Sequence, residues 1–297
     1  MSLRLRLLNR WLRLTERPAL QRAQDPDKLR RGFERKARLF FHPPRGTRCE
    51  AQDLDGAKML QVTPRSTDPA APVTLYFHGG AYVFGSPKTH RAMLARLCAM
   101  TGGMALLPRY RRAPEHPFPA ALEDALAAYR AVAARHGPPV IGGDSAGGGL
   151  ALALLGRILQ EGLPRPLGCF GFSPLTDLTF SGASVKTQAS RDVVLPADRV
   201  DEMAQMYLQG AEPADPGASP LFADFHNAPP VWLTAGDTEI LLDDTRRMAA
   251  HLRAQGVQVA ERIVPDHPHV WPIFHNILPE ARSTLRELAD WSRDLSR

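Results

Sequence analysis

The sequence predicts an α/β fold with a mostly parallel central sheet, helices on both of its faces and a helical cap. Short apolar runs alternate with helical segments from residue 73 onward, and most of the runs are apolar on both faces, as strands covered on both sides require. The expected strands are 73–77, 104–108, 139–143, 167–172, 231–235 and 257–264. The expected helices are 88–101, 119–136, 146–161, 243–255 and 277–295.

The composition fits one globular core in a chain of 297 residues. Cys49, Cys98 and Cys169 are odd in number and lack C-x-x-C spacing, which argues against a disulfide framework or a zinc site and favours the reducing cytoplasm. No apolar run reaches the ~18 residues of a membrane span. Nucleic-acid binding is not expected either, because no aromatic-rich basic stripe is present.

The excess positive charge lies in the first 48 residues, which hold 14 Lys and Arg against four acidic residues. At about 100° per residue, one face of a first helix is basic and formed by Arg6, Arg10, Arg13 and Arg17. The opposite face is apolar and formed by Leu5, Leu8, Trp11 and Leu12. Such a helix either lies on an anionic membrane surface or caps a globular domain with its leucines inward and its arginines in solvent. We favour the cap.

A second helix is expected to begin after Asp25, with Pro26 at its first position. Its apolar stripe consists of Leu29, Phe33, Ala37 and Phe40.

The alternation of strands and helices breaks between residues 176 and 225, where 195–210 is expected to form one helix within loops. Together with the two N-terminal helices, this insertion would form a lid over the carboxyl edge of the sheet. The expected organisation is an N-terminal helical cap segment (1–48), a first part of the core (49–175), a cap insertion (176–225) and a second part of the core (226–297).

The stretch Gly143-Asp144-Ser145-Ala146-Gly147 matches the pattern G-x-S-x-G between an expected strand and an expected helix. A serine on so sharp a turn adopts a strained backbone conformation, so glycine is needed two positions before and two after it. The helix that follows directs backbone N–H groups and a positive dipole end toward negative charge above Ser145. The pattern predicts a nucleophilic serine.

A second turn, His78-Gly79-Gly80-Ala81, follows another expected strand. Its backbone N–H groups, together with that of Ala146, would bind the oxyanion of a tetrahedral intermediate.

The acid and the base of a triad should follow the serine in the chain. Among the acidic residues after the strand 231–235 we favour Glu239 over Asp243, with Asp237 third, because Asp243 lies where a helix start favours carboxylates. His269 is favoured as the base, with His267 behind it, because both lie on a proline-rich loop after the last strand.

From these residues, the chain resembles the hormone-sensitive lipase family of α/β hydrolases, the bacterial esterase branch. The matching blocks are HGGAYVFGS, YRRAPEHPFPAALEDA, GGDSAGGGLALAL, GDTEILLDD and DHPHVW, in the expected order. The resemblance implies the α/β-hydrolase fold, Ser145 as nucleophile, His269 as base and the Glu239 position as acid. Two departures are Glu239, where relatives more often have Asp, and Ala81, where a third glycine is usual.

The function implied is a carboxylesterase that hydrolyses short- to medium-chain acyl esters and needs no metal or cofactor. Apolar pocket candidates near the lid are Tyr82, Phe84, Met203, Met206 and Tyr207. A serine amidase or formamidase on the same fold is an alternative, as is a non-catalytic ligand-binding receptor, although His269 argues against a receptor. By analogy with relatives, a homodimer through the final strand and helix is also left open.

Overall fold

The computed structural model describes residues 2–296 and confirms the expected α/β-hydrolase architecture. In the described residues one sheet has the strand order β1-β2-β4-β3-β5-β6-β7-β8. The strands are β1 (Arg48–Leu54), β2 (Ala57–Thr63), β3 (Thr74–Phe77), β4 (Ala105–Pro108), β5 (Val140–Asp144), β6 (Gly168–Phe172), β7 (Val231–Gly236) and β8 (Val259–Val264). From β4 to β8 neighbouring strands are parallel, whereas β1 pairs with β2, and β2 with β4, in antiparallel fashion.

The hairpin of β1 and β2 was not among the expected strands. β1 is nowhere fully buried, and the polar residues Lys58 and Gln61 interrupt the apolar positions of β2, so neither strand has the continuous apolar run of the central strands. The turn is Asp55-Gly56, with both residues at positive φ, and the Gly56 N–H donates to the Asp53 carboxylate at 2.8 Å. An Asp-Gly pair between two short strands is a hairpin signal that the apolar pattern alone does not show.

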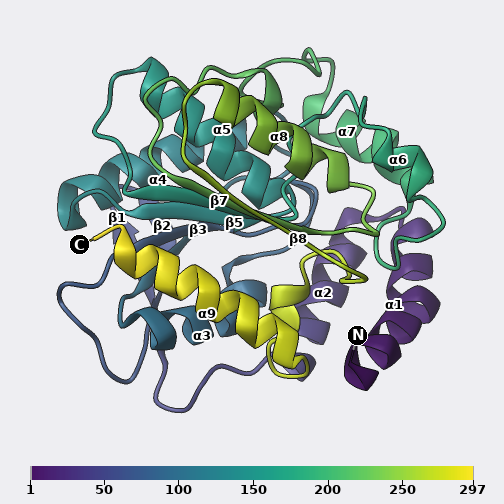
Figure 1. Ribbon diagram of the computed structural model, residues 1–297, viewed down its shortest axis with the longest axis horizontal. Coiled ribbons are helices and arrows are strands. Elements are labelled where there is room, and N and C mark those ends of the chain that lie inside the picture. Colours follow the sequence, from purple (N-terminus) through teal and green to yellow (C-terminus); the bar gives the residue numbers. More distant parts are fainter. Residues whose placement is uncertain (1, 297) are drawn as a thin grey trace.

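Helices cover both faces of the sheet (Figure 1). On one face lie α3 (Pro87–Thr101) and α9 (Pro279–Asp294), and on the other lie α4 (Ala120–His136), α5 (Ala146–Gln160) and α8 (Leu242–Ala254). Each of these helices agrees with its expected range to within two residues. The apolar side chains form a separate buried cluster on each face, which fixes the carboxyl edge of the sheet as a rigid support.

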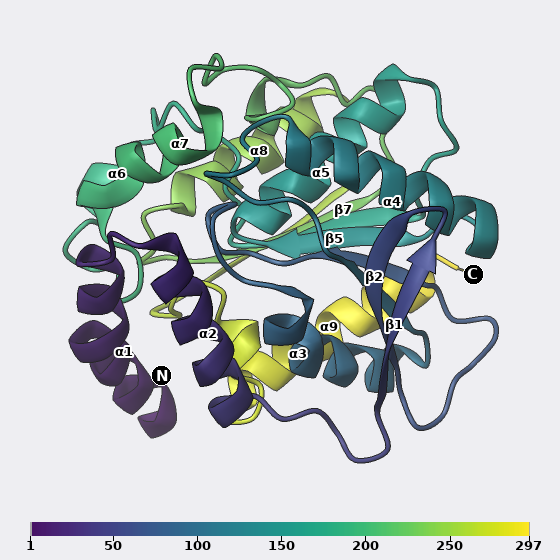
Figure 2. The ribbon, with the colours of Figure 1, turned by 180° about the vertical axis from the view of Figure 1, so that it is seen from behind.

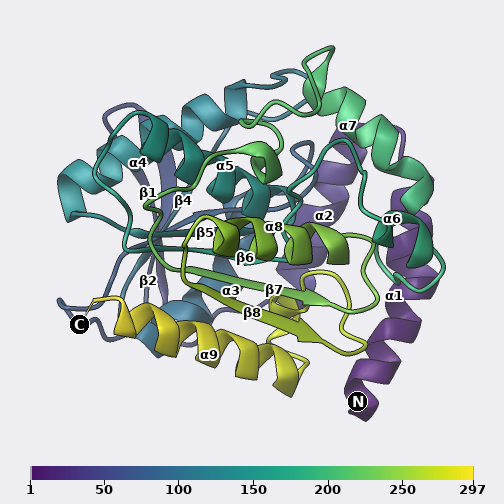
Figure 3. The same ribbon diagram turned by 45° about the horizontal axis from the view of Figure 1, so that its top comes forward.

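The cap consists of α1 (Leu3–Gln21), α2 (Pro26–Phe40), α6 (Ser184–Thr187) and α7 (Val200–Leu208). Figure 2 and Figure 3 show α1 and α2 side by side at one end of the sheet, with α6 and α7 close to the end of α1. Asp25 caps α2 as expected, accepting hydrogen bonds from the N–H groups of Asp27 and Lys28. The expected helix 195–210 is shorter: a 3₁₀ turn, Ala197–Arg199, precedes α7.

Three leucines of α1 pack inward, as the cap interpretation requires, whereas Trp11 of the same expected apolar face is 38% exposed. Leu5, Leu8 and Leu12 are buried against a cluster that includes Val193 and Trp271. The arginines, however, are not all in solvent.

Arg13 donates to the carbonyl oxygens of Ser190 and Arg191, and Arg17 to those of Ala189 and Asp192. These bonds join α1 to the cap insertion. Among the described residues no helix is both long and apolar enough to cross a membrane.

Candidate active site

Ser145 lies on a sharp turn between β5 and α5. Its φ of 52° and ψ of −125° are rare for a residue with a side chain. A Cβ on Gly143 would lie 2.2 Å from the carbonyl oxygen of Gly147, and a Cβ on Gly147 would lie 2.1 Å from that of Phe77. Both flanking glycines are therefore sterically required, as the motif suggests.

The loops that follow β7 and β8 bring Glu239 and His269 together. His269 Nδ1 lies 2.6 Å from Glu239 Oε2, and both side chains are buried. Glu239 Oε1 accepts hydrogen bonds from the Gly236 N–H at 2.5 Å and from the Ser173 hydroxyl at 2.8 Å. The Glu239 carboxylate is thus fixed on both oxygens, and a proton on Nδ1 leaves Nε2 with a lone pair in neutral His269.

His269 Nε2 is buried, has no hydrogen-bond partner among the described residues, and belongs to a ring that lines the same cavity as Ser145. Burial by itself would lower the pKa of His269, but the hydrogen bond and the charge of Glu239 outweigh burial, so the pKa is raised above its usual 6.5. This is the state expected of a group that accepts a proton and is then stabilised as a cation.

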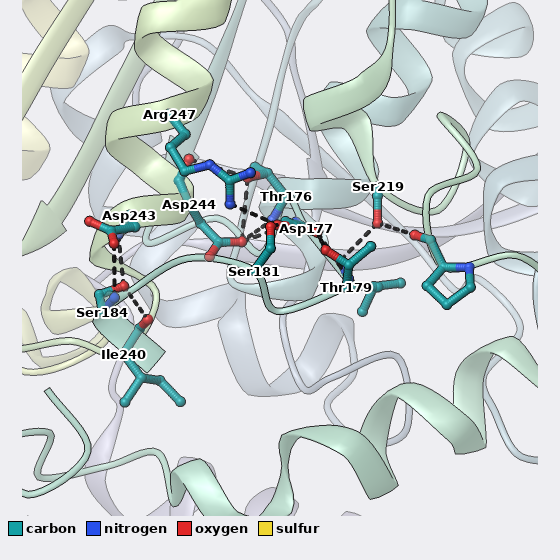
Figure 4. A network of polar contacts seen from close by, with 12 residues as sticks. Thr176, Asp177, Thr179, Ser181, Ser184, Ser219, Ile240, Asp243, Asp244 and Arg247 are labelled. Carbon is teal, nitrogen blue, oxygen red and sulfur yellow. Dashed lines mark hydrogen bonds and ion pairs between the residues drawn. The ribbon is translucent and has the colours of Figure 1, made fainter. Parts of the chain in front are cut away.

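The other candidate acids and the second histidine have different partners. Asp243 Oδ2 accepts from the Ser184 N–H at 2.8 Å, and Asp237 Oδ1 accepts from the Asp266 N–H at 2.7 Å. His267 Nδ1 lies 2.7 Å from the Pro265 carbonyl oxygen, and its ring packs against Trp271. Figure 4 shows Asp243 turned toward Ser184, in a polar network that includes neither Glu239 nor His269. The structure brings Glu239, and not Asp243, to His269.

The turn after β3 lies beside the cavity. Gly79, Gly80 and Ala81 line the cavity with Ser145. The Gly79 N–H is already donated to Asp144 Oδ1 at 2.9 Å, whereas those of Gly80 and Ala81 have no acceptor among the described residues. Ala81 has a φ of 52°, so the turn accommodates its Cβ in the left-handed region and keeps its N–H.

A buried carboxylate, Asp144, holds that turn in place. Besides the Gly79 N–H, its Oδ1 accepts the Tyr76 hydroxyl at 2.6 Å and lies 3.3 Å from His90 Nε2. Burial would raise the pKa of Asp144, but His90, Tyr76 and Gly79 together lower it, so the carboxylate stays charged. The motif contains Asp144, but its partners are far away in the sequence and could not be assigned from spacing.

Asp192, in the cap insertion, is a second residue that the sequence did not single out. Its buried carboxylate accepts the N–H groups of Val194, Leu195 and Ile240 at 2.8 to 2.9 Å. Burial raises the pKa of Asp192 despite the nearby His269, and Asp192 in turn favours the charged form of His269. Because Ile240 follows Glu239 directly, Asp192 joins the cap to the Glu239 loop.

The cavity has a volume of about 490 Å³ and a mainly apolar lining. Of the five pocket candidates, Phe84 and Met203 line it and Tyr82, Met206 and Tyr207 do not. The rings of Tyr82 and Tyr207 are stacked on each other, with centroids 3.7 Å apart, and both are fully buried in the core. Met206 packs against the same core cluster. The sequence did not predict that the N-terminal helices also line the cavity, through side chains that include Leu7, Trp11, Phe33 and Phe40.

No group of three or more His, Cys, Asp or Glu side chains that could hold a metal ion occurs among residues 2–296.

Comparisons with known proteins show the family of this chain. A family model described as the alpha/beta hydrolase fold matches residues 74–273, more than half of the chain, and defines the protein as a hydrolase of this class. The crystal structure of an esterase from the bacterial hormone-sensitive lipase family superposes with a TM-score of 0.94 at 34% identity, covering 100% of this chain and 99% of that one. This chain belongs to that family of esterases.

Sequence relatives carry similar names. An acetyl-hydrolase of Streptomyces hygroscopicus is 40% identical over 214 residues, which are 71% of this chain and 72% of the relative. An esterase of Acinetobacter venetianus is 31% identical over 288 residues, which are 96% of this chain and 94% of the relative.

Proposed function

We propose that the protein is a serine carboxylesterase that acts on short- to medium-chain acyl esters, with Ser145, His269 and Glu239 as its triad. The observation that carries the proposal is the unpartnered Nε2 of His269, in the same cavity as Ser145, while Nδ1 is bound to Glu239 at 2.6 Å. An acceptor nitrogen and a nucleophile that share a cavity are the requirement for activating a hydroxyl.

In this mechanism Ser145 Oγ attacks the ester carbonyl carbon while His269 Nε2 takes the hydroxyl proton. The N–H groups of Gly80, Ala81 and Ala146 stabilise the oxyanion, and Gly79 positions their turn through its bond to Asp144. When the C–O bond to the alcohol breaks, the alcohol leaves with the proton from His269. Water then attacks the acyl-enzyme in the same way and releases the carboxylic acid, while Glu239 stabilises the imidazolium without being protonated.

The acyl preference is inferred from the cavity and from the relatives. A mainly apolar cavity of about 490 Å³ can enclose a small acyl ester, and one relative is an acetyl-hydrolase by name. The fixed leucines of α1 close one side of this space, since Leu8 and Leu12 both line it and are buried.

Labelling with a serine-directed organophosphate, followed by peptide mapping, tests the nucleophile. We expect one labelled peptide that contains Ser145, and no label in Ser145→Ala. A series of p-nitrophenyl esters then tests the substrate class, with turnover expected to peak at short to medium acyl chains. Label on another residue would overturn the triad, turnover that rises steadily into long chains would overturn the acyl preference, and faster cleavage of matched anilides would favour an amidase.

A further inference from the structure

The first helix has a second, exposed set of large hydrophobic side chains beside its buried face. Seven large hydrophobic side chains are exposed among the described residues, and six of them lie on α1 and α2. Their exposed fractions range from 38% to 71%. We call these six the rim patch: Leu3, Leu7, Trp11, Leu14, Leu39 and Phe40.

The rim patch spans both N-terminal helices. Leu3, Leu7, Trp11 and Leu14 follow one side of α1 at helical spacing, separate from the buried side formed by Leu5, Leu8 and Leu12. Across the gap between the helices, the rings of Trp11 and Phe40 meet edge to face with centroids 5.7 Å apart. An apolar surface of this kind marks an interaction site, because exposed hydrophobic side chains in monomeric proteins are normally scattered.

The rim patch also forms the outer wall of the active-site cavity. Leu7, Trp11 and Phe40 line the cavity and are exposed at the same time, so the cavity reaches the surface between α1 and α2. Figure 2 shows these two helices at the outer end of the molecule, with no other element outside α1. A partner bound to the patch would therefore face the opening of the cavity.

The charges around the rim patch indicate which partner fits it. The four acidic residues of the first 48 are engaged within the protein: Glu16 with Lys36 at 2.7 Å, Asp27 with Arg30 at 3.0 Å, Glu34 with the Ser86 hydroxyl, and Asp25 as the cap of α2. The side chains of six exposed arginines of the same helices make no hydrogen bond or ion pair among the described residues. They are Arg6, Arg10, Arg22, Arg31, Arg35 and Arg38.

We propose that the rim patch and these arginines dock the protein on the surface of an anionic lipid membrane. Apolar side chains that enter the headgroup region, next to arginines that contact lipid phosphates, are the combination that such a surface binds. A second copy of the chain fits less well, since two identical arginine-rich faces would repel each other. When the protein is docked in this way, its cavity opens toward the lipid and can receive esters that partition into the membrane. This consequence rests on the proposed function, whereas the docking itself does not.

Co-sedimentation of the full chain with phosphatidylcholine vesicles, with and without one quarter phosphatidylglycerol, tests the proposal. We expect at least tenfold stronger binding to the anionic vesicles at 50 mM NaCl, most of it lost at 500 mM because salt screens the arginines. Leu3→Asp/Leu14→Asp and Arg6→Glu/Arg10→Glu should each weaken vesicle binding by at least tenfold. None of these four side chains lines the cavity, so turnover of a soluble ester without vesicles should stay within twofold of the wild type.

Matched controls are Phe222→Asp, the one exposed large hydrophobic outside the patch among the described residues, and Arg135→Glu on α4. Both should bind vesicles like the wild type. Equal binding to neutral and anionic vesicles, or wild-type binding by both double variants, would overturn the proposal. A dimer in solution that Leu3→Asp/Leu14→Asp dissociates would assign the patch to a second copy instead. If the wild-type protein did not hydrolyse a soluble ester, that result would contradict only the proposed function.

Discussion

Two buried carboxylate–histidine pairs lie beside the same cavity, and they serve different purposes. In one, Glu239 Oε2 is 2.6 Å from His269 Nδ1; in the other, Asp144 Oδ1 is 3.3 Å from His90 Nε2. His90 and His269 both line the cavity. The difference lies in the second ring nitrogen: His269 Nε2 has no partner among the described residues, whereas His90 Nδ1 lies 2.8 Å from Thr89 Oγ1.

The comparison teaches that a buried carboxylate beside a histidine does not by itself identify a catalytic base. His90 has both ring nitrogens engaged, so it is suited to holding the Asp144 charge and, through it, the Gly79 turn. His269 keeps one nitrogen for substrate chemistry, and the Glu239 charge raises its pKa. In the proposed mechanism the first pair exchanges a proton with Ser145, whereas the contacts of the second pair hold a backbone turn.

Glu239→Gln should have the largest effect, since it breaks the first pair while keeping the side-chain shape. We expect kcat to fall by roughly 10³–10⁴-fold, because an amide neither stabilises the imidazolium nor fixes the proton on Nδ1. His269 acts as a base only when neutral, so activity is lost as the pH falls through its raised pKa. Without the Glu239 charge that pKa drops, and the acidic limb of kcat/KM should move to lower pH.

The matched control is Asp243→Asn, which changes the alternative acid in the first turn of α8. Asp243 bonds to the Ser184 backbone and not to His269, so this variant should keep kcat within severalfold of the wild type. A kcat/KM profile from pH 4 to 9 on one p-nitrophenyl ester separates the two. Asp243→Asn losing as much activity as Glu239→Gln would show that the acid has been assigned to the wrong residue.

Asp144→Asn should break the second pair, with a smaller loss of activity and a measurable loss of stability. The contacts from Tyr76, Gly79 and His90 all reach Oδ1 of Asp144, and an amide oxygen accepts the same hydrogen bonds without the negative charge. We therefore expect the variant to be about 1–3 kcal/mol less stable and its kcat to be roughly tenfold lower. The folded pKa of Asp144 lies below its usual value. Its contribution to stability is therefore present above about pH 4 and is lost as the pH falls through the folded pKa.

Chemical denaturation at pH 7 and at low pH, together with kinetics, measures both effects. The stability deficit should shrink at low pH, and the acidic limb should move less than in Glu239→Gln, because Asp144 contributes less than Glu239 to the raised pKa of His269. His90→Asn should reproduce the stability loss. If Asp144→Asn had normal stability but a strongly shifted acidic limb of kcat/KM, Asp144 would instead take part in proton transfer.

The parts of the fold and the site that short-range sequence signals define were predictable. The sharp turn at Ser145 was predictable because Gly143 and Gly147 meet its steric requirement, and the central strands were predictable from their apolar runs. Glu239 and His269 were found from chain order and from their place after β7 and β8, and the structure brings them within 2.6 Å.

What could not be predicted depends on partners far apart in the chain. The Asp144–His90 contact joins residues 54 positions apart by number, and Asp192 bonds to Ile240 from a loop with no regular pattern. Tyr82 and Tyr207 looked like pocket residues because apolar aromatic side chains suit either a pocket or a core. Only their stacking against each other assigns them to the core.

Another buried carboxylate, Asp244, has no histidine partner and so extends the comparison with the smallest expected effect. Its Oδ1 accepts the N–H groups of Thr176 and Asp177, while Oδ2 has no partner among the described residues (Figure 4). Burial raises the pKa of Asp244 to about 7, and the charge of Asp177 adds to this effect. Between about pH 4 and 7 the folded state binds a proton that the unfolded state releases, so stability falls as the pH rises through this range.

Asp244→Asn removes this titration and keeps the Oδ1 acceptor. Compared with the wild type, we expect the stability of this variant from thermal unfolding to be nearly unchanged at pH 5 and about 1–2 kcal/mol higher at pH 8. Its ester turnover should be unchanged. Asp177→Asn is the matched control with the opposite sign, because the pKa of Asp177 is lowered in the folded state and its carboxylate pairs with Arg247 at 2.8 Å. It should lose stability at pH 8. Equal destabilisation of Asp244→Asn at both pH values would show that its carboxylate acts only as a hydrogen-bond acceptor, and that burial without a histidine does not suffice to keep it protonated.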